Sequence, residues 1–365
     1  MTTPPEAPTR PTVALLSMGG TIAMAQSEDT AEGVVPALGG EQLVAAVSGL
    51  RDTGVELVVH DFRQLPGASL QVRDVLDLAV AIDDAVADGA AGVVVTQGTD
   101  TIEETAFLLD LVHRADAPVV VTGAMRNPMM AGADGPANLL AAVRVAASPL
   151  ARGLGCLVVM SDEIHAARFV RKVHSTSTKA FASPNLGPIG QVVEGTPCLL
   201  VRPHRGPGVH HVPVGTPPRV ALLTVALGDD GELLRSIDQR FAGLVVAAFG
   251  VGHVPAALAP ILGDLAARIP VVLASRTGAG PVLRSTYGFA GSERDLLDRG
   301  LISAGFLDPF KARLLLQLLL MVAATPDEIA RTFDAAGRHC GESSADAQVD
   351  RSVDAQPASP LRGIE

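Results

Sequence analysis

The feature that most constrains the fold of this chain is a regular alternation of short β-branched runs and longer helical patterns along its first two hundred residues. The runs are almost continuously apolar, which is typical of parallel strands buried on both faces. Five of them predict strands at Val13–Leu16, Val55–His60, Gly92–Thr96, Val119–Thr122 and Leu157–Met160. Such alternation predicts a mostly parallel sheet with helices on both faces.

Helical patterns separate these runs. Apolar residues across Val72–Val86 recur at the spacing of one helix face, and Gly89 follows as the expected C-cap. A second pattern begins at Thr101 with Glu104 three residues later, the arrangement of a capping box. A third follows Asp134-Gly135-Pro136, where an acidic cap and an early proline indicate a helix start.

The chain changes character at residues 202–218, a segment rich in proline and glycine that predicts a linker. A second, shorter α/β series follows. We expect a helix at Pro255–Arg268 and strands at Val220–Val225, Leu244–Ala248 and Pro270–Ala274. A helix that starts at Asp308-Pro309 is apolar all round, so we expect it in a core or a subunit contact.

The fold class that follows is α/β, with a larger N-terminal domain built on a mostly parallel sheet and a smaller C-terminal α/β domain. The expected boundaries are a disordered N-terminus at 1–11, domains at 12–201 and 219–340, the linker at 202–218 and a disordered tail at 341–365.

Composition excludes several classes of protein. The 365 residues are 48% hydrophobic and 18% charged, so most of the chain has enough apolar surface to fold. A formal net charge of −11 without basic clusters argues against nucleic acid as a partner. No apolar run reaches the roughly 18 residues of a membrane span and no signal peptide is evident, so we expect a cytoplasmic protein without a membrane partner. Three distant cysteines without CxxC spacing favour neither a zinc cluster nor a disulfide scaffold.

Lysine and tyrosine are rare in this chain. Of the 28 basic residues only Lys172, Lys179 and Lys311 are lysines, and Tyr287 is the one tyrosine. Codon bias explains the many arginines, but burial can lower the pKa of a lysine until it acts as a base, which arginine does not do. Lys311 on a helix and Lys179 in a loop are expected at ordinary positions, which leaves Lys172 as the candidate base.

Two loops at strand ends form the candidate site. The first strand ends in SMGGTIA (17–23) and the third in TQGTDT (96–101), so each places a threonine beside glycines. Ligands of open parallel sheets bind at the carboxyl ends of the strands. Neither loop has the pattern of a nucleotide-binding loop. Tight turns alone explain one such loop, whereas two at the same sheet edge favour a functional site.

A threonine hydroxyl is a weak nucleophile and needs a base to accept its proton. Lys172 follows the fifth predicted strand and, once desolvated, is able to deprotonate a hydroxyl, while Asp100 at a predicted helix N-terminus is able to orient it. An ordinary surface cation is the alternative explanation of Lys172.

Taken together, the motifs resemble those of the bacterial-type L-asparaginases. GGTIA at 19–23 and QGTDTIEET at 97–105 look like the two signature motifs of that family, and GAMR at 123–126, ADGPANL at 133–139 and KAR at 311–313 look like its further blocks. The matches run in order from about Thr12 to Phe333. The resemblance implies amide hydrolysis through an acyl-enzyme, without a metal or organic cofactor.

The resemblance also implies roles for single residues. Thr21 attacks the side-chain carboxamide of asparagine, ammonia leaves, and water then releases aspartate. Thr99, Asp100 and Lys172 correspond to the family's set that moves protons and orients groups, and Asp100 also faces the substrate's α-ammonium group. Backbone N–H groups near Thr99 and Ala124 are candidates for the oxyanion site.

A residue from a second subunit is expected at the same site. Counting back from Gly300 places Glu293 at the glutamate that a neighbouring subunit contributes to the α-ammonium pocket of the family. The resemblance therefore implies a homo-oligomer with a shared active site, a dimer or a tetramer built from dimers. A solvated carboxylate at a helix start is the alternative explanation of Glu293.

Two positions depart from the family pattern. The segment Met24–Pro36 has no tyrosine where the family has one that assists the nucleophile, and our hypothesis is that Tyr287, six residues before Glu293, reaches the site from the neighbouring subunit. A low-activity or regulated enzyme is the rival explanation. The serine–glutamine pair that binds the α-carboxylate is altered in Leu65–Leu70, where Ser69 is the nearest hydroxyl and backbone N–H groups are an alternative.

The leading hypothesis is hydrolysis of asparagine, a small amino-acid amide. Alternatives are a glutaminase, an amidotransferase-type subunit that releases ammonia for a partner, and a noncatalytic amino-acid sensor. The absence of a docking domain disfavours the amidotransferase, and the presence of both nucleophile and base disfavours the sensor. A solvated linker explains three further histidines better than a metal site does: His204, His210 and His211.

Overall fold

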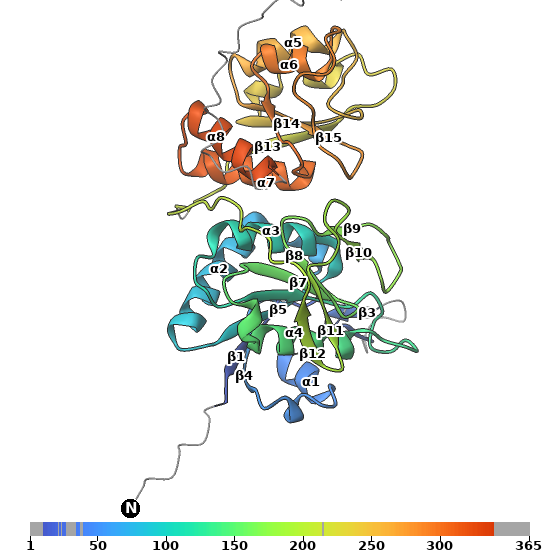
Figure 1. Cartoon of the computed structure of the whole chain (residues 1–365), viewed down its shortest axis with the longest axis vertical. Helices are drawn as coiled ribbons and strands as arrows, with labels where there is room; N and C mark the ends of the chain where they lie inside the picture. The colour runs from blue at the N-terminus through green and yellow to red at the C-terminus, as the bar shows by residue number, and fades with distance from the viewer. Residues whose placement is uncertain are drawn as a thin grey trace, which may run out of the picture.

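The computed structural model describes residues 10–20, 22, 24–26, 34–36, 39–213 and 215–338, with backbone alone for 24–26 and 34–36. The expected nucleophile Thr21, most of the tyrosine-free loop and the tail at 341–365 lie outside the described residues, as do positions 1–9 of the expected disordered N-terminus. Figure 1 shows two α/β domains arranged one above the other, each with its own sheet.

The N-terminal domain is built on eight strands: β1 (Thr12–Ser17), β4 (Glu56–Asp61), β5 (Gly92–Thr96), β6 (Val119–Thr122), β7 (Cys156–Met160), β8 (Glu163–Ala166), β11 (Gly190–Val193) and β12 (Thr196–Leu199). Their order across the sheet is β12-β11-β8-β7-β6-β5-β1-β4. The five strands from β7 to β4 are parallel, and the other three add antiparallel. The predicted mostly parallel sheet is therefore confirmed.

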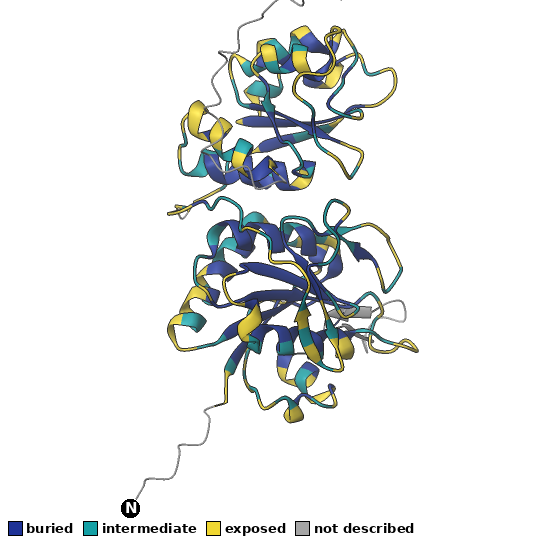
Figure 2. Cartoon of the chain, in the orientation of Figure 1, coloured by how far each residue is buried: buried dark blue, intermediate teal, exposed yellow. Residues whose placement is uncertain are grey.

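Helices cover both faces of this sheet: α1 (Gly40–Ala45), α2 (Val72–Ala87), α3 (Ile102–Val112) and α4 (Gly135–Ala147). Side chains of β5 alternate between the two faces, because Val93 and Val95 pack in the core with α2 and α3 whereas Val94 packs in the core with α1 and α4. All three are fully buried, as are most residues of the parallel strands in Figure 2.

Short elements lie between the main helices and strands of both domains. Turns of 3₁₀ helix lie at η2 (Arg51–Thr53), η3 (Gly67–Ser69), η4 (Thr99–Thr101), η5 (Pro149–Ala151), η6 (Glu232–Leu234) and η7 (Ile237–Gln239). Two antiparallel pairs of short strands join β2 (Met24–Gln26) to β3 (Val34–Pro36) and β9 (Arg171–Lys172) to β10 (Phe181–Ala182).

Two expected helix caps are wrong in their chemistry, although both helices exist. Thr101 precedes α3, but its hydroxyl donates to the carbonyl of Gly67 instead of capping the helix (3.0 Å). Asp134 precedes α4, but its carboxylate accepts the backbone N–H groups of Met125 and Arg126. In both cases a neighbouring loop competes successfully for the capping side chain.

The C-terminal domain has a smaller parallel sheet of four strands in chain order: β13 (Val220–Thr224), β14 (Gly243–Ala248), β15 (Val271–Ser275) and β16 (Ile302–Ser303). Its helices are α5 (Leu258–Ala266), α6 (Glu293–Asp298), α7 (Pro309–Met321) and α8 (Pro326–Gly337). The first two pack on one face of the sheet, and the last two pack on the other face, which is turned toward the N-terminal domain in Figure 1.

Helix α7 is apolar all round because it is enclosed by both domains. One side packs against β13–β15 and the other against α3, in a single core cluster that runs through both domains. Its start is fixed by Asp308, whose carboxylate accepts the N–H of Phe310 (2.8 Å). The expectation that this helix is buried is confirmed, with a domain core as its place.

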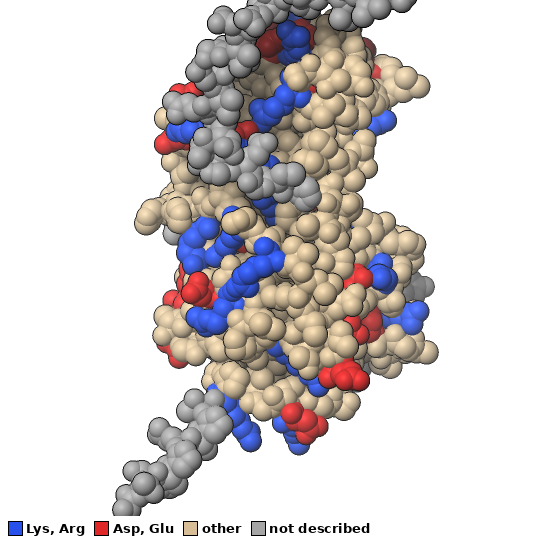
Figure 3. Space-filling model, in the orientation of Figure 1, with Lys and Arg blue, Asp and Glu red and all other residues tan. Residues whose placement is uncertain are grey.

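The described residues between β12 and β13 form no helix or strand. They still contact the N-terminal domain, since the N–H of buried Val209 donates to the carbonyl of Leu111 (2.9 Å). Arg205 lies 3.6 Å from the buried carboxylate of Asp110. On the face shown in Figure 3, basic side chains gather on the N-terminal domain close to its junction with the C-terminal domain. Among the described residues no helix has the length and apolar character to cross a membrane.

Candidate active site

Loops from four neighbouring strands meet at the carboxyl edge of the N-terminal sheet, where ligands of such sheets bind. Glycines permit this contact. A Cβ on Gly20 would lie 2.0 Å from the backbone N of Gly98, and a Cβ on Gly67 would lie 2.9 Å from the carbonyl oxygen of Gly98. Gly20 also has a φ of +87°, a conformation that other residues rarely adopt. A Cβ on Gly98 would in turn lie 2.9 Å from the backbone N of Gly67, so glycine is required at all three positions, including those directly before Thr21 and Thr99.

Lys172 joins the two polar side chains of the loop after β5. Its Nζ lies 2.9 Å from Thr99 Oγ1 and 2.9 Å from Asp100 Oδ1. The Lys172 side chain is 16% exposed, whereas that of Asp100 is 63% exposed. An amine between a buried hydroxyl and an open carboxylate is placed to exchange protons with the hydroxyl while the carboxylate holds it in position.

The backbone of Lys172 is held by a second carboxylate. Glu103, in the first turn of α3, accepts the N–H of Lys172 (2.7 Å) and is itself buried. Burial raises the pKa of Glu103, which the nearby charge of Lys311 and this hydrogen bond oppose. Glu103 thus ties α3 to β9, although its charge is costly at this depth.

Lys311 is not the ordinary helix lysine that we expected. It is 1% exposed, and its Nζ donates to the carbonyls of Arg168 (3.1 Å) and Val170. Burial lowers its pKa to about 8, against the attraction of Asp308 and Glu103. Lys311 therefore connects α7 of the C-terminal domain to the segment that leads into Lys172. The other lysine, Lys179, is exposed and pairs with Glu163 (2.9 Å).

Ala124 lies in the loop after β6, directly beside the loop after β5. A Cβ on the preceding Gly123 would lie 2.5 Å from the carbonyl oxygen of Gln97, so the two loops are in backbone contact. Asp134 and Asn138 hold this loop through its N–H groups and the Gly123 carbonyl. The N–H groups of Thr99 and Ala124 have no acceptor among the described residues, and both residues are buried.

Ser69 lies in η3 at the end of the loop after β4. Its side chain is exposed, and its N–H donates to the carbonyl of Pro66 (2.9 Å). The same turn is tied to the loop after β5, since Thr101 Oγ1 donates to the Gly67 carbonyl. The structure thus brings the Ser69 turn to the sheet edge that holds Thr99 and Asp100.

Glu293 and Tyr287 lie together in the C-terminal domain. Figure 1 places α6, which begins at Glu293, on the side of that domain away from the N-terminal sheet. Glu293 is fully buried: Oε1 accepts the N–H groups of Thr286 (2.9 Å) and Tyr287 (2.8 Å), and Oε2 lies 3.1 Å from His253 Nε2. Burial alone would raise the pKa of Glu293, but the hydrogen bonds from Tyr287, His253 and Thr286 outweigh it and hold the pKa below its ordinary value.

The phenol of Tyr287 belongs to an aromatic surface cluster. Its ring packs edge to face against His253 with 4.9 Å between the centroids, and His253 packs in the same way against Phe289. Tyr287 is 44% exposed and Phe289 is 51% exposed. Both rings are thus open on the outer surface of one chain.

The sequence motifs predict the edge of the sheet but not the side chains that hold the Lys172 segment in place. Glu103 lies within the 97–105 motif without a predicted role, and the rarity of lysine was the available signal for Lys311. His253 gave no signal, because only the fold brings it to Glu293. In the part of the chain that the structure describes, His, Cys, Asp and Glu side chains form no group of three or more suited to a metal ion.

Comparison with known proteins agrees with this geometry. Residues 12–203 match the N-terminal asparaginase family, and residues 219–333 match the glutaminase/asparaginase C-terminal domain. A "probable L-asparaginase" of Deinococcus radiodurans is 40% identical over 333 residues, which cover 88% of this chain and 97% of that protein. A "glutaminase-asparaginase" of Acinetobacter glutaminasificans is 33% identical over 338 residues, which cover 88% of this chain and 98% of that protein.

The fold has a solved counterpart as well. The crystal structure of a "probable cytoplasmic L-asparaginase" from Campylobacter jejuni aligns with a TM-score of 0.80 at 31% identity, covering 89% of this chain and 99% of that one. Both domains, in the expected order, therefore have the same relatives. The chain belongs to the asparaginase/glutaminase family.

Proposed function

We propose that this asparaginase-family amidohydrolase converts L-asparagine to L-aspartate and ammonia through an acyl-enzyme on Thr21. The observation that carries the proposal is the position of Lys172, whose Nζ lies 2.9 Å from both Thr99 Oγ1 and Asp100 Oδ1 at the carboxyl edge of the sheet. A binding protein has no need of an amine on a hydroxyl, whereas amide hydrolysis needs a group there to move protons.

In this mechanism the Thr21 hydroxyl oxygen attacks the carboxamide carbon and its proton is passed on to a base. The N–H groups of Thr99 and Ala124 receive the oxyanion that forms, and the base returns the proton to the leaving nitrogen, so that the C–N bond breaks and ammonia is expelled. A water molecule deprotonated through Thr99 and Lys172 then attacks the acyl carbon. The threonyl ester bond breaks as the Thr21 oxygen takes up that proton, and aspartate is released. Asp100 keeps Lys172 in place and meets the substrate's α-ammonium group with its exposed oxygen.

The remaining contacts of the substrate are also proposals. The turn that carries Ser69 is near enough in the fold to offer its hydroxyl or its backbone N–H groups to the α-carboxylate. We propose that a neighbouring subunit in a homo-oligomer brings Tyr287 to the site and that Glu293 holds it there. Glu293 is fully buried in its own chain, so a direct contact with the α-ammonium group requires the residues around it to move, whereas positioning the Thr286–Tyr287 turn requires no movement.

Ammonia release is the decisive measurement, made on the unaltered chain and on Thr21→Val with asparagine and with glutamine in separate assays. We expect the unaltered chain to release ammonia from asparagine and the variant to release almost none. Full activity of Thr21→Val rejects the nucleophile, and no release from either amide by the unaltered chain rejects the reaction. Faster release from glutamine than from asparagine makes the chain a glutaminase, which the relatives named glutaminase-asparaginase leave open.

A cytoplasmic location is proposed from the Campylobacter jejuni structure, which is that of a probable cytoplasmic L-asparaginase. A Haemophilus influenzae relative at 33% identity is named a probable periplasmic L-asparaginase, which makes the periplasm the alternative. Fractionation of cells that express the full chain, with asparaginase activity assayed in each fraction, decides between them.

A further inference from the structure

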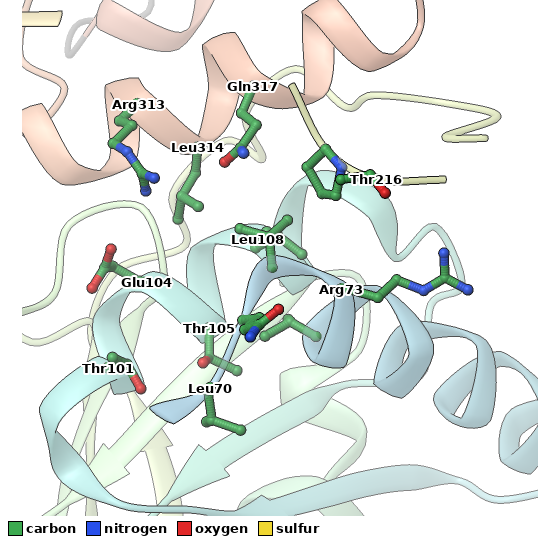
Figure 4. Close-up of a pocket in the computed structure, with 14 residues that line it drawn as sticks. Leu70, Arg73, Thr101, Glu104, Thr105, Leu108, Thr216, Arg313, Leu314 and Gln317 are labelled. Carbon is green, nitrogen blue, oxygen red and sulfur yellow. The ribbon is translucent and has the colours of Figure 1, made fainter. Parts of the chain in front are cut away.

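A cavity of about 360 Å³ lies between the domains, where α7 crosses the N-terminal ends of α2 and α3. Figure 4 shows side chains from α7 reaching toward it from one side and side chains from α3 from the other. Its volume is that of a small-molecule site. Lys172, Thr99 and Asp100 do not line it, so it is a different cavity from the proposed active site.

Gln317 presents a buried oxygen to this cavity. The residue is 5% exposed, and its amide nitrogen donates to the carbonyl of Pro218 (2.8 Å). The amide oxygen is buried and has no hydrogen-bond partner among the described residues. Because a buried acceptor without a donor is unfavourable, this oxygen indicates a ligand with an N–H group.

Opposite charges lie on the two sides of the cavity. Arg313 comes from α7 and Glu104 from α3 (Figure 4). Arg313 Nε donates to the carbonyl of Val220 (3.0 Å), and no ion pair within 4.0 Å joins Arg313 to Glu104 in the described structure. Burial, and next the charge of Glu103, raise the pKa of Glu104, while Arg313 opposes this shift from a distance. Each charge is thus placed to pair with a ligand that bridges the cavity.

We propose that this cavity is a second ligand site and that it binds a free α-amino acid. The α-carboxylate pairs with the Arg313 guanidinium, and the α-ammonium group donates to Glu104 and to the amide oxygen of Gln317. A zwitterion is the small ligand that satisfies a cation, an anion and a neutral acceptor together. Apolar walls for its side chain are supplied by three leucines: Leu70, Leu108 and Leu314.

The cavity is connected to the active edge through Thr101. This residue lines the cavity and belongs to η4, the same turn as Thr99 and Asp100. Its hydroxyl donates to the Gly67 carbonyl of η3 and lies 3.4 Å from Gln97 Nε2. A ligand that joins α7 to α3 therefore also contacts the turn that carries the proposed catalytic groups.

Calorimetric titration of the full chain with L-leucine, whose side chain matches the apolar walls, tests the proposal. We expect one equivalent per chain that depends on the cavity. Arg313→Gln and the isosteric Glu104→Gln should each weaken the cavity equivalent by about tenfold or more. Arg235→Gln, which removes an exposed arginine paired with Glu232, is the matched control and should bind as the unaltered chain does.

Two variants keep the test decisive if one of them does not fold, and thermal unfolding identifies such a failure. Loss of the same equivalent in Arg313→Gln and Glu104→Gln, with ammonia release retained, supports the site. Equal binding by the unaltered chain and a folded cavity variant, or no binding of leucine by the unaltered chain, overturns it. The reaction is tested by ammonia release and the cavity by the binding of leucine, so failure of one is distinguishable from failure of the other.

Discussion

Asp100 and Glu293 show how differently the two domains use a carboxylate. Asp100 is 63% exposed at its side chain and pairs with Lys172, so most of its acceptor sites stay open at the edge of the N-terminal sheet. Glu293 is fully buried and is held by two backbone N–H groups and a histidine. The first carboxylate is open to solvent at the sheet edge. The second holds the backbone of the Thr286–Tyr287 turn, so we propose that it acts on a ligand only through this turn.

Removal of the Lys172 amine at the carboxyl edge of the N-terminal sheet should have the largest effect on kcat. Lys172→Met keeps the length of the side chain but removes the group that contacts Thr99 Oγ1 and Asp100 Oδ1. Because proton transfer by a positioned group contributes about 10²–10⁴-fold, we expect kcat for ammonia release to fall by about 10³-fold. Steady-state kinetics with asparagine measures the change.

Lys179→Met is the matched control, since Lys179 is exposed and pairs with Glu163 near the same hairpin. Its kcat should stay within about twofold, because exposed ion pairs contribute little. A Lys172→Met enzyme that keeps near-normal kcat with unchanged thermal unfolding would show that the amine moves no proton in the rate-limiting step.

Glu293→Gln tests the buried carboxylate of the C-terminal domain. An amide presents one acceptor and one donor group where Glu293 accepts from Thr286, Tyr287 and His253, so the turn loses part of its support. A charge-assisted hydrogen bond is worth about 1.5–3 kcal/mol, which corresponds to a fall in kcat/KM of roughly tenfold to a hundredfold. Initial rates at low asparagine concentration measure it.

Mixing variants decides whether this turn serves the neighbouring subunit. Lys172→Met and Glu293→Gln damage different halves of a shared site, so a mixed dimer contains one site with both halves intact. Dissociation and reassociation of an equal mixture should restore about a quarter of the unaltered kcat/KM, from symmetry and random pairing. Activity that stays at the mean of the two parents contradicts sharing.

Lys311 joins the two regions, and its pKa predicts a pH dependence of stability. The folded pKa is about 8 against an ordinary 10.5, so the unfolded chain binds more protons between these values. The free energy of unfolding contributed by Lys311 should therefore rise with pH across this window, by at least about 1 kcal/mol. Denaturant unfolding of the unaltered chain and Lys311→Met at several pH values isolates this contribution as their difference.

At neutral pH, Lys311→Met should also lower the free energy of unfolding by about 2 kcal/mol, because the carbonyls of Arg168 and Val170 lose their donor. A difference between the two proteins that is flat from pH 8 to 10.5 would mean that Lys311 is not desolvated. Equal stability at neutral pH would mean that these two carbonyls find other donors.

The sequence predicted the sheet because burial on both faces leaves a strong pattern. The runs at Gly92–Thr96 and Val119–Thr122 coincide with β5 and β6, whose residues are all buried. Caps were less predictable, because the side chains of Thr101 and Asp134 are taken by loops that are distant in sequence. Local sequence patterns indicate only partners that are near in sequence, so they do not show that a distant loop competes for the same side chain.

The candidate site shows the same limit. Lys172 was predictable as a rare residue after a strand, and the fold then brings it to Thr99 and Asp100. The partners of Glu293 were not, since His253 lies 40 residues away and the other donors are backbone N–H groups, which no side-chain pattern marks. Whether a carboxylate is open or closed depends on backbone geometry, and that is what the structure adds.

The smallest expected effect belongs to Tyr287→Phe, which removes one hydroxyl and keeps the ring that packs against His253. If this phenol replaces the missing loop tyrosine, kcat should fall by about tenfold, below the range of about 10²–10⁴-fold for a full acid–base group, because the hydroxyl assists the nucleophile without being its base. Phe289→Leu is the control: it alters the same aromatic cluster without touching a hydroxyl, so kcat should stay near normal. A fall in kcat in both variants would mean that packing of the turn causes the effect. A normal kcat in both would mean that Glu293 holds a turn that takes no part in the reaction. A fall in kcat in Tyr287→Phe alone would mean that the buried Glu293 carboxylate holds in place a phenol that takes part in the reaction at a neighbouring subunit's sheet edge.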